Sequence, residues 1–251
     1  MRSQEDTGSM KFEYNTVRKE ACVEYIEKKS RFIAYVKYIA NEEEAIAYIN
    51  EIKSKNRDAR HNVYAYNVHI SDDGMNVGHD MNTGDGDTSD SELADRCYAR
   101  TAVRYSDDGE PQGTAGIPVL ETINKNGLSD IVVVVTRYFG GILLGAPGLA
   151  RAYGKAAALG IEAAGRAVRI LCDVVNIKIP YVLLGKIQNE LESKKYLNEY
   201  FLKEIIYEEN VSMIICVKKG LYEQFMAFIT EITNSLCEFE KYGSEVITRQ
   251  L

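Results

Sequence analysis

The stretch TRYFGGILLGAPGLARAYGKAA, residues 136–157, decides how the fold of this chain is read. It follows the apolar run at residues 131–135, which is typical of a strand covered on both faces of a sheet. Pro147 is well placed to open a helix, and Gly165 to end one near Ala164. The sequence therefore predicts a strand, a glycine-rich turn and a helix, which raises the question of whether the turn holds a phosphate.

Two nucleotide-binding motifs can be tested against the spacing of these glycines. The dinucleotide motif G-x-G-x-x-G is missing, because Gly140 and Gly141 are adjacent and Gly145 follows alone. The phosphate loop is missing as well, because the interval from Gly148 to Gly154 is one residue too long. The spacing therefore excludes a P-loop ATPase and a Rossmann dinucleotide site at this turn.

A weaker anion site remains possible at the same place. The predicted helix N-terminus offers free N–H groups. Arg151 and Lys155 share one helix face, where an anion would offset their repulsion, and Arg137 ends the strand beside the turn. We predict a contact with a phosphate or an acidic protein surface. In the alternative, these cations are solvated, and Gly154 and Gly160 only let the helix pack closely.

The composition is that of a globular protein, with 45% hydrophobic and 27% charged residues in 251. The five cysteines form no C-x-x-C pair, which predicts a cytoplasmic protein without a disulfide framework or a zinc site. Because no apolar run approaches the ~18 residues of a membrane span and no signal peptide opens the chain, we expect neither a membrane contact nor export.

The net charge of −7 is unevenly distributed. Residues 71–110 hold 3 basic and 11 acidic side chains, whereas residues 111–170 hold 6 basic and 3 acidic ones. The negative net charge of the whole chain argues against a protein that coats nucleic acid, and we expect no DNA partner. The basic stretch leaves room for one local anionic contact.

The first part of the chain, residues 10–170, reads as one domain. Residues 21–39 predict two strands around a turn at Lys28 and Lys29, and residues 61–70 predict another strand. Between them, Asn41 and Glu44 predict a helix start. Residues 116–124 predict a further short helix.

An acidic insertion at residues 71–103 interrupts this domain, and order is expected to resume near Arg104. It is rich in Gly, Asp, Asn and Ser and lacks the spacing of a calcium loop, so we expect a solvated loop and no metal. The polar residues 1–9 are expected to be a tag or a frayed terminus.

The remaining residues, 171–251, alternate as strand, helix, strand, strand, helix, strand. The predicted hairpin turns at residues 208–210, and a short last strand is expected at 244–248. This order is that of a ferredoxin-like domain. The predicted fold class is α+β, in two domains.

The sequence contains few patterns that are typical of catalytic sites. His61 lies just before a predicted strand, beside Arg60. Asp107, Asp108 and Glu110 could form a catalytic carboxylate set, but turn formers in a hairpin are the favoured interpretation. Neither G-x-S-x-G nor H-E-x-x-H occurs. We therefore expect no cofactor, and an enzyme is the less favoured class.

Four segments together resemble the YigZ/Impact family: KKSRFIAYV, ARHNVYAYNV, RYSDDGEPQGTAGIPVL and the segment from VVVVTRYFGG to the helix. Residues 137–145 match the signature of that family, and the tail resembles the small C-terminal domain of its bacterial members. The resemblance implies an N-terminal domain similar to the second domain of ribosomal protein S-five and a C-terminal domain similar to the last domain of elongation factor G. It also implies a role in translational control, in which eukaryotic relatives act through protein contacts.

The chain departs from the family pattern in its acidic insertion. SDDG occurs twice, at 71–74 within the insertion and at 106–109, where it carries the EPQGTAG of the family pattern. The insertion could screen the motif loops from a phosphate backbone.

Three functions stay open at this point. The first is a regulatory protein that contacts RNA, the ribosome or a translation-related protein. The second is an enzyme for a small phosphate-bearing substrate in a cleft by residues 137–145, and the third is a protein-interaction module only. The candidate binding residues are Arg137, Gly140, Gly141, Arg151 and Lys155, with Arg60, His61, Asp107, Asp108 and Glu110 nearby.

Overall fold

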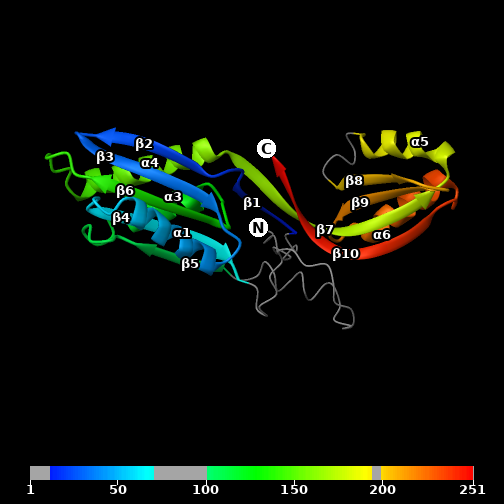
Figure 1. Ribbon diagram of the computed structural model, residues 1–251, viewed down its shortest axis with the longest axis horizontal. Helices are drawn as coiled ribbons and strands as arrows, with labels where there is room; N and C mark the ends of the chain where they lie inside the picture. The colour runs from blue at the N-terminus through cyan, green and yellow to red at the C-terminus, as the bar shows by residue number, and fades with distance from the viewer. Residues whose placement is uncertain (1–11, 71–100, 194–198, 251) are drawn as a thin grey trace, which may run out of the picture. The chain divides into compact units, whose positions relative to one another are not determined.

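The computed structural model describes residues 12–70, 101–193 and 199–250, which form two compact units (Figure 1). Unit 1 comprises Met1–Val168 with Arg249–Leu251, and unit 2 comprises Arg169–Thr248. The expected tag and the acidic insertion up to residue 100 lie outside the described residues. The insertion was predicted to run to residue 103, but strand β5 already begins at Thr101.

Unit 1 is built on a five-stranded antiparallel sheet in the order β2-β3-β6-β4-β5. The strands are β2 (Ala21–Glu27), β3 (Ser30–Tyr38), β4 (His61–His69), β5 (Thr101–Ser106) and β6 (Ile131–Tyr138), after a short β1 (Glu13–Val17). The helices are α1 (Glu42–Lys55), α3 (Gly116–Lys125) and α4 (Ala146–Ala164).

Strand β6 lies in the middle of this sheet and is buried on both faces, as its apolar run predicts. Val133 and Val135 pack in the core under α3 and α4, whereas Val132 and Val134 pack in the core under α1. Because side chains alternate along a strand, one continuous valine run supplies both cores. The sheet therefore lies between two helical layers (Figure 1).

The turns and helix ends of unit 1 largely follow the sequence signals. Lys28 and Lys29 both have positive φ in the turn between β2 and β3, which suits a tight hairpin. The Asn41 side chain accepts from the Glu44 backbone N–H at 2.8 Å and caps α1. Helix α4 begins one residue before Pro147 and ends at Gly165.

Unit 2 has the order of elements expected for a ferredoxin-like domain. Its four strands pair in the order β10-β7-β9-β8, within a five-stranded sheet in which β1 also pairs with β7, so the first and third strands of the domain are adjacent. The elements are β7 (Arg166–Ile179), α5 (Tyr181–Leu191), β8 (Tyr200–Tyr207), β9 (Val211–Lys218), α6 (Tyr222–Thr233) and β10 (Glu238–Gln250).

The last strand, β10, is longer than the predicted strand at residues 244–248. Its first half is mostly exposed and charged, so it carries no apolar alternation, and backbone pairing with β7 holds it in the sheet. Within the described residues, none of the helices is both long and apolar enough to span a membrane.

Candidate functional site

The family-like motifs meet at one end of the unit 1 sheet. Because neighbouring strands are antiparallel, the start of β3, the end of β6, the start of β4 and the end of β5 lie at the same end. The register places Arg137 of β6 opposite both Phe32 of β3 and His61 of β4. These three side chains therefore project from the same face of the sheet, the face covered by α3 and α4.

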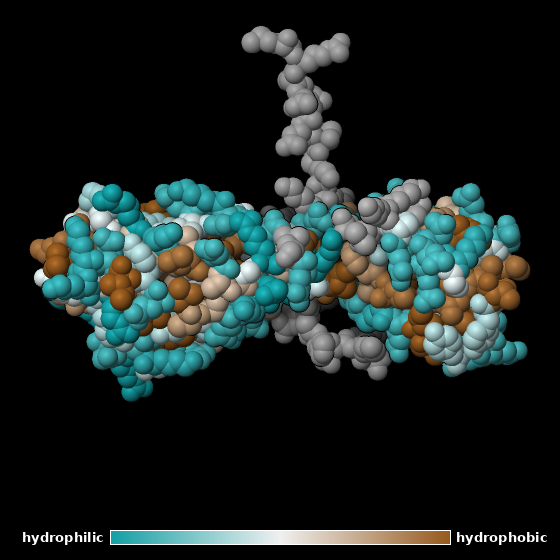
Figure 2. Space-filling model, turned by 90° about the horizontal axis from the view of Figure 1, so that it is seen from above, coloured by the Kyte–Doolittle hydropathy of each residue, from teal (hydrophilic) through white to brown (hydrophobic). Residues whose placement is uncertain are grey.

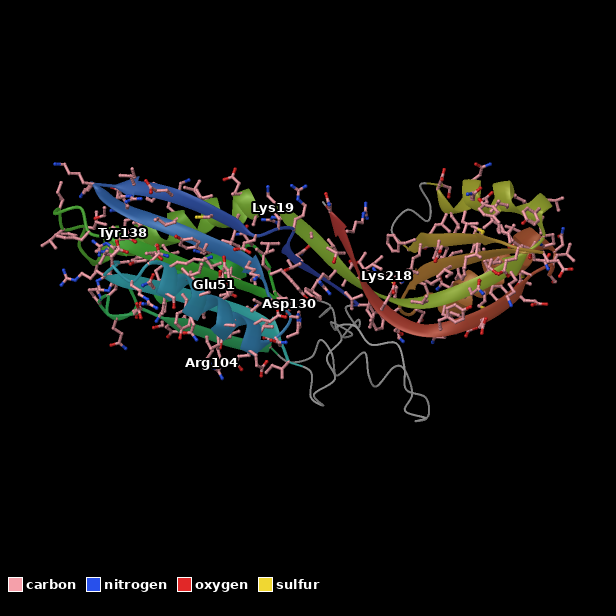
Figure 3. The ribbon with its side chains drawn as sticks, viewed as in Figure 1. Lys19, Glu51, Arg104, Asp130, Tyr138 and Lys218 are labelled. Atoms are coloured by element: carbon pink, nitrogen blue, oxygen red, sulfur yellow. The ribbon has the colours of Figure 1, made fainter. Side chains whose placement is uncertain are left out.

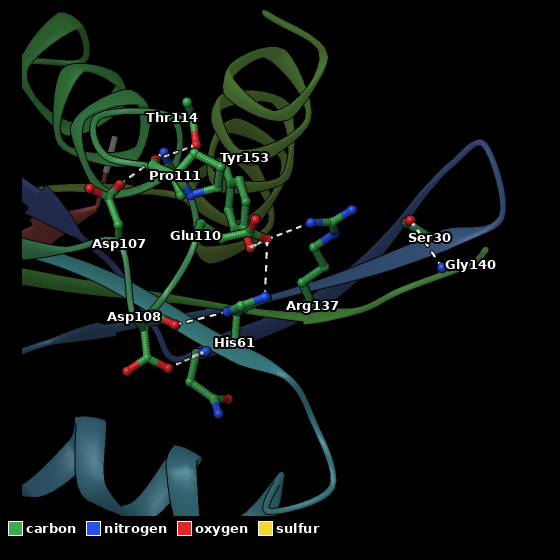
Figure 4. A network of polar contacts seen from close by, with 12 residues as sticks. Ser30, His61, Asp107, Asp108, Glu110, Pro111, Thr114, Arg137, Gly140 and Tyr153 are labelled. Atoms are coloured by element: carbon green, nitrogen blue, oxygen red, sulfur yellow. Dashed lines mark hydrogen bonds and ion pairs between the residues drawn. The ribbon is translucent and has the colours of Figure 1, made fainter. Parts of the chain in front are cut away.

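The Glu110 carboxylate is the centre of a polar network at this end (Figure 4). Its Oε1 accepts from Arg137 Nη1 at 2.6 Å and from the Tyr153 hydroxyl at 2.8 Å. His61 Nε2 lies 3.9 Å from the same oxygen. The Glu110 and Arg137 side chains are only 4% and 7% exposed. A buried carboxylate is thus matched by a buried guanidinium and a hydroxyl donor.

The orientation of the His61 ring follows from its second contact. His61 Nδ1 lies 2.8 Å from the carbonyl oxygen of Asp108. Since a carbonyl only accepts hydrogen bonds, Nδ1 carries the hydrogen. In the neutral ring, Nε2 then holds the lone pair and faces Glu110.

Asp108 joins this turn to two other elements. Its carboxylate accepts from Lys53 of α1 at 2.8 Å and from the Asn62 backbone N–H at 2.7 Å. Its φ of 44° is tolerated by aspartate better than by most residues. Asp108 therefore fixes the turn against α1 and β4.

Asp107 caps the helix that follows the turn. Its carboxylate accepts from the backbone N–H groups of Gly113, Ala115 and Gly116, at 2.8, 3.1 and 2.8 Å. The turn was predicted to belong to a hairpin, but it connects β5 to α3 instead. The carboxylates of Asp107 and Asp108 thus hold a strand-to-helix connection.

Arg137 was predicted to join an anion contact beside the turn, and in the structure its side chain is buried against Glu110. Position 137 faces α3 and α4 from a central strand, so its side chain is covered and its charge is opposed by Glu110. The guanidinium carbon lies 5.5 Å from the centroid of the Phe32 ring and 5.6 Å from that of Phe139. Nε is buried and makes no hydrogen bond with the described residues.

Tyr153 was missed by sequence reasoning. Burial, reinforced by the Glu110 carboxylate, raises the pKa of this phenol well above its ordinary value, so the hydroxyl remains a hydrogen-bond donor. Its signal was a tyrosine on the buried stripe of α4, among alanines. A fully buried tyrosine hydroxyl needs a partner, and a carboxylate in a neighbouring motif is the natural one.

Gly140 and Gly141, in the loop between β6 and α4, are required for different structural reasons. A Cβ on Gly140 would lie 2.0 Å from the Lys29 carbonyl carbon, so only glycine fits there. The Gly140 N–H also donates to Ser30 Oγ at 3.1 Å. Gly141 meets nothing within 4 Å, but its φ is +83°. The loop is therefore pressed against the turn between β2 and β3.

The two glycines of α4, Gly154 and Gly160, also differ in how much space a Cβ atom would have. A Cβ on Gly160 would approach Val36 Cγ2 to 2.8 Å, which supports close packing of α4 on β3. At Gly154 the nearest atom would be 3.6 Å away, an ordinary contact. Close packing therefore requires a glycine at 160 and not at 154.

The remaining predicted cations lie outside the network. Arg60, Arg151 and Lys155 are exposed. The Arg151 Nε donates to the carbonyl of Pro147 in its own helix, at 3.3 Å. The structure thus brings together His61, Glu110 and Arg137, and it leaves the α4 cations on the surface.

Four exposed cations lie at this sheet end, two of them in the turn next to Gly140. We call them the cationic end: Lys28, Lys29, Arg57 and Arg60. All four are exposed and make no hydrogen bond or ion pair with any residue that the structure describes. Of the nearby acids, Glu24 pairs with Arg31 at 2.7 Å, whereas Glu27 and Asp58 accept from the Tyr25 and Tyr138 hydroxyls.

Exposed apolar side chains accompany the cationic end. Phe139, Ile142 and Leu143 are 44%, 42% and 83% exposed, and we call residues 139–143 the apolar loop. Figure 2 shows hydrophobic surface at the left end of unit 1, where Figure 1 places the connection between β6 and α4. In the described part of the chain, no cluster of His, Cys, Asp or Glu is arranged to hold a metal.

Comparison with protein families finds two matches along the chain. Residues 28–161 match the model of the Impact N-terminal domain, and residues 177–235 match a domain of unknown function (DUF1949). The first match covers the sheet end and its loops.

Named relatives agree with these matches. The Bacillus subtilis "IMPACT family member YvyE" is 36% identical over 91% of this chain and 90% of its own length. The Escherichia coli "IMPACT family member YigZ" is 36% identical over 51% of this chain and 50% of its own. The Dictyostelium discoideum "Protein IMPACT homolog" is 33% identical over 47% of this chain and 27% of its own.

A solved structure described as "Crystal structure of an hypothetical protein" has a similar fold. It is 24% identical, with a TM-score of 0.51, over 90% of this chain and 96% of its own. At this identity the similarity concerns the fold alone.

Proposed function

This chain is a two-domain member of the Impact family, and from that premise we propose that it is a regulatory protein of translation that contacts RNA on or near the ribosome. The contact surface is the cationic end of unit 1 with its apolar loop. The family resemblance supports the cellular setting, since eukaryotic relatives act in translational control.

The main observation in support of an RNA contact is the cationic end itself. Four exposed cations without a described partner gather at one end of a chain whose net charge is −7. Unbalanced cations of this kind attract a phosphate backbone and release its counterions. Glu24 is neutralised by its ion pair with Arg31, whereas Asp58 and Glu27 accept only from tyrosine hydroxyls and keep their charge, so the four cations outnumber the nearby unpaired acids.

The buried network supports this surface from beneath. Arg137 and Tyr153 both donate to Glu110, and Asp107 and Asp108 hold backbone groups. Their bonds join β4, β6, α1, α3 and α4 at the sheet end. The network thus acts as a frame that holds the loops in place for binding.

Co-sedimentation with ribosomes and with unstructured RNA tests the proposal. The test variant is Lys28→Ala/Lys29→Ala/Arg60→Ala. The control, Lys19→Ala/Lys125→Ala/Lys178→Ala, removes the same charge from exposed lysines elsewhere. Figure 3 shows Tyr138 and Lys19 at opposite ends of unit 1.

We expect wild type and control to sediment with RNA at low salt and the test variant to lose most of this binding. A test variant that binds like the control would contradict the assigned surface. Wild type that binds neither ribosomes nor RNA would contradict the proposed function. A further variant, Arg151→Ala/Lys155→Ala, decides whether the α4 face contributes.

A further inference from the structure

We propose that the Phe139 ring is a stacking platform for an unpaired base of single-stranded RNA. This inference rests on the proposed function and names the form of RNA that the surface takes. Base faces are accessible only where RNA is unpaired, and proteins recognise them by stacking on aromatic rings.

The ring is held from the protein side by a charged group. The Arg137 guanidinium carbon lies 5.6 Å from the Phe139 centroid, and the same guanidinium lies 5.5 Å from the Phe32 centroid. Glu110 fixes it further through a 2.6 Å hydrogen bond. Phe139 therefore rests on a positioned cation, which is itself backed by a buried ring.

The backbone on both sides of Phe139 is also fixed. Tyr138 precedes it and pairs with Arg31 across the sheet. Gly140 follows it and is pressed against Lys29 and Ser30, with its N–H donating to Ser30 Oγ at 3.1 Å. A ring placed in this way loses little freedom when a ligand stacks on it.

Phe139 nevertheless remains 44% exposed. Most large apolar side chains of unit 1 are buried, so an aromatic ring that is anchored beneath and open above is suited to a flat ligand. The cationic end lies at the same end of the sheet, as Lys28 and Lys29 belong to the turn that Gly140 touches and Arg60 precedes His61, which pairs with Arg137. An aromatic platform beside free cations is the pattern of a single-strand site.

The absence of tryptophan from the sequence makes a direct test possible. Phe139→Trp installs the only tryptophan, and its fluorescence should be quenched when a base stacks on it. The probes are a uridine 12-mer, a 12-mer of abasic ribose phosphate and a 12-bp RNA duplex. Leu143→Trp, on an 83% exposed residue of the same loop, is the matched control.

We expect the uridine 12-mer to quench Phe139→Trp strongly, the abasic 12-mer and the duplex to quench it weakly, and Leu143→Trp to respond little to any of them. Phe139→Ala should weaken binding of the uridine 12-mer about tenfold and binding of the abasic 12-mer hardly at all. Equal urea-unfolding midpoints for wild type and Phe139→Ala exclude misfolding as the cause.

Equal quenching by uridine and abasic strands, or unchanged affinity in Phe139→Ala, would overturn the stacking platform. If the Lys28→Ala/Lys29→Ala/Arg60→Ala variant still loses binding in that case, the proposed function stands without it. A wild type that binds no strand overturns both. Preference for the duplex would also overturn the platform, because a duplex offers phosphates without free base faces.

Discussion

At the scale of single residues, the pair of Glu110 and Arg137 governs the sheet end. Both side chains are almost fully buried and 2.6 Å apart. A buried ion pair gives little net stability over apolar residues, but removing one partner strands the other charge. The pair therefore fixes the positions of the surrounding side chains and adds little to the net stability of the fold.

Glu110→Gln should reduce the free energy of unfolding by about 3 kcal/mol, because the amide leaves the buried Arg137 without a counter-charge. Urea unfolding measures this loss. The control Glu121→Gln removes a carboxylate that is 59% exposed and pairs with Lys125 one turn away, and it should cost less than about 0.5 kcal/mol. Equal losses in the two variants would contradict the role of the buried pair.

Tyr153 makes stability fall at high pH. Burial raises the pKa of its phenol. Its contribution is therefore present below the ordinary tyrosine pKa near 10 and is lost as pH rises, since only the unfolded chain releases the proton. Above pH ~10.5, the unfolding free energy of wild type should fall more steeply than that of Tyr153→Phe, by about 1.4 kcal/mol per pH unit. If urea unfolding gave the same pH dependence of the unfolding free energy for both proteins between pH 10.5 and 11.5, this role of Tyr153 would be ruled out.

At the scale of elements, the stability of the loop between β6 and α4 depends more on Gly140 than on Gly141. Gly140→Ala should cost about 3 kcal/mol, because the added methyl would overlap the Lys29 backbone, which cannot move without breaking the hairpin. Gly141→Ala has space and should cost only the strain of its positive φ, about 1 kcal/mol. Thermal unfolding of the two variants compares them, and the reverse order would contradict the described packing.

The elements themselves were largely predictable from the sequence. The apolar run before the glycines predicts a strand buried on both faces, and β6 confirms it. The pattern of helices and strands after residue 171 predicts the ferredoxin-like order, which the strand order of unit 2 confirms. Each signal is local, so one sequence is enough to read it.

Contacts between distant elements were not predictable in the same way. The cap that Asp107 forms on α3 crosses six to nine residues. The meeting of Glu110, Arg137 and Tyr153 depends on the register of β6 and on how α4 lies over it. Without that register, the sequence predicted an anion contact for Arg137 and did not reveal its pairing with Glu110. The exposure of Phe139 also became visible only once the loop had a position.

At the scale of the whole molecule, charge distribution decides what kind of RNA contact is possible. The chain carries −7 overall, and the cationic end offers four exposed positive side chains that have no partner among the described residues. Binding should therefore be local and moderate in its salt dependence. Four contacts to single-stranded phosphates predict a slope of about −3 for the logarithm of the binding constant against the logarithm of the salt concentration.

The most direct measurement is this salt slope for a uridine 12-mer in wild type, in Lys28→Ala/Lys29→Ala/Arg60→Ala and in the control Lys19→Ala/Lys125→Ala/Lys178→Ala. We predict a slope of about −3 for wild type and control, and about −1 for the variant of the cationic end. Equal slopes in the two triple variants, or binding that ignores salt, would contradict an RNA contact at this end of the sheet.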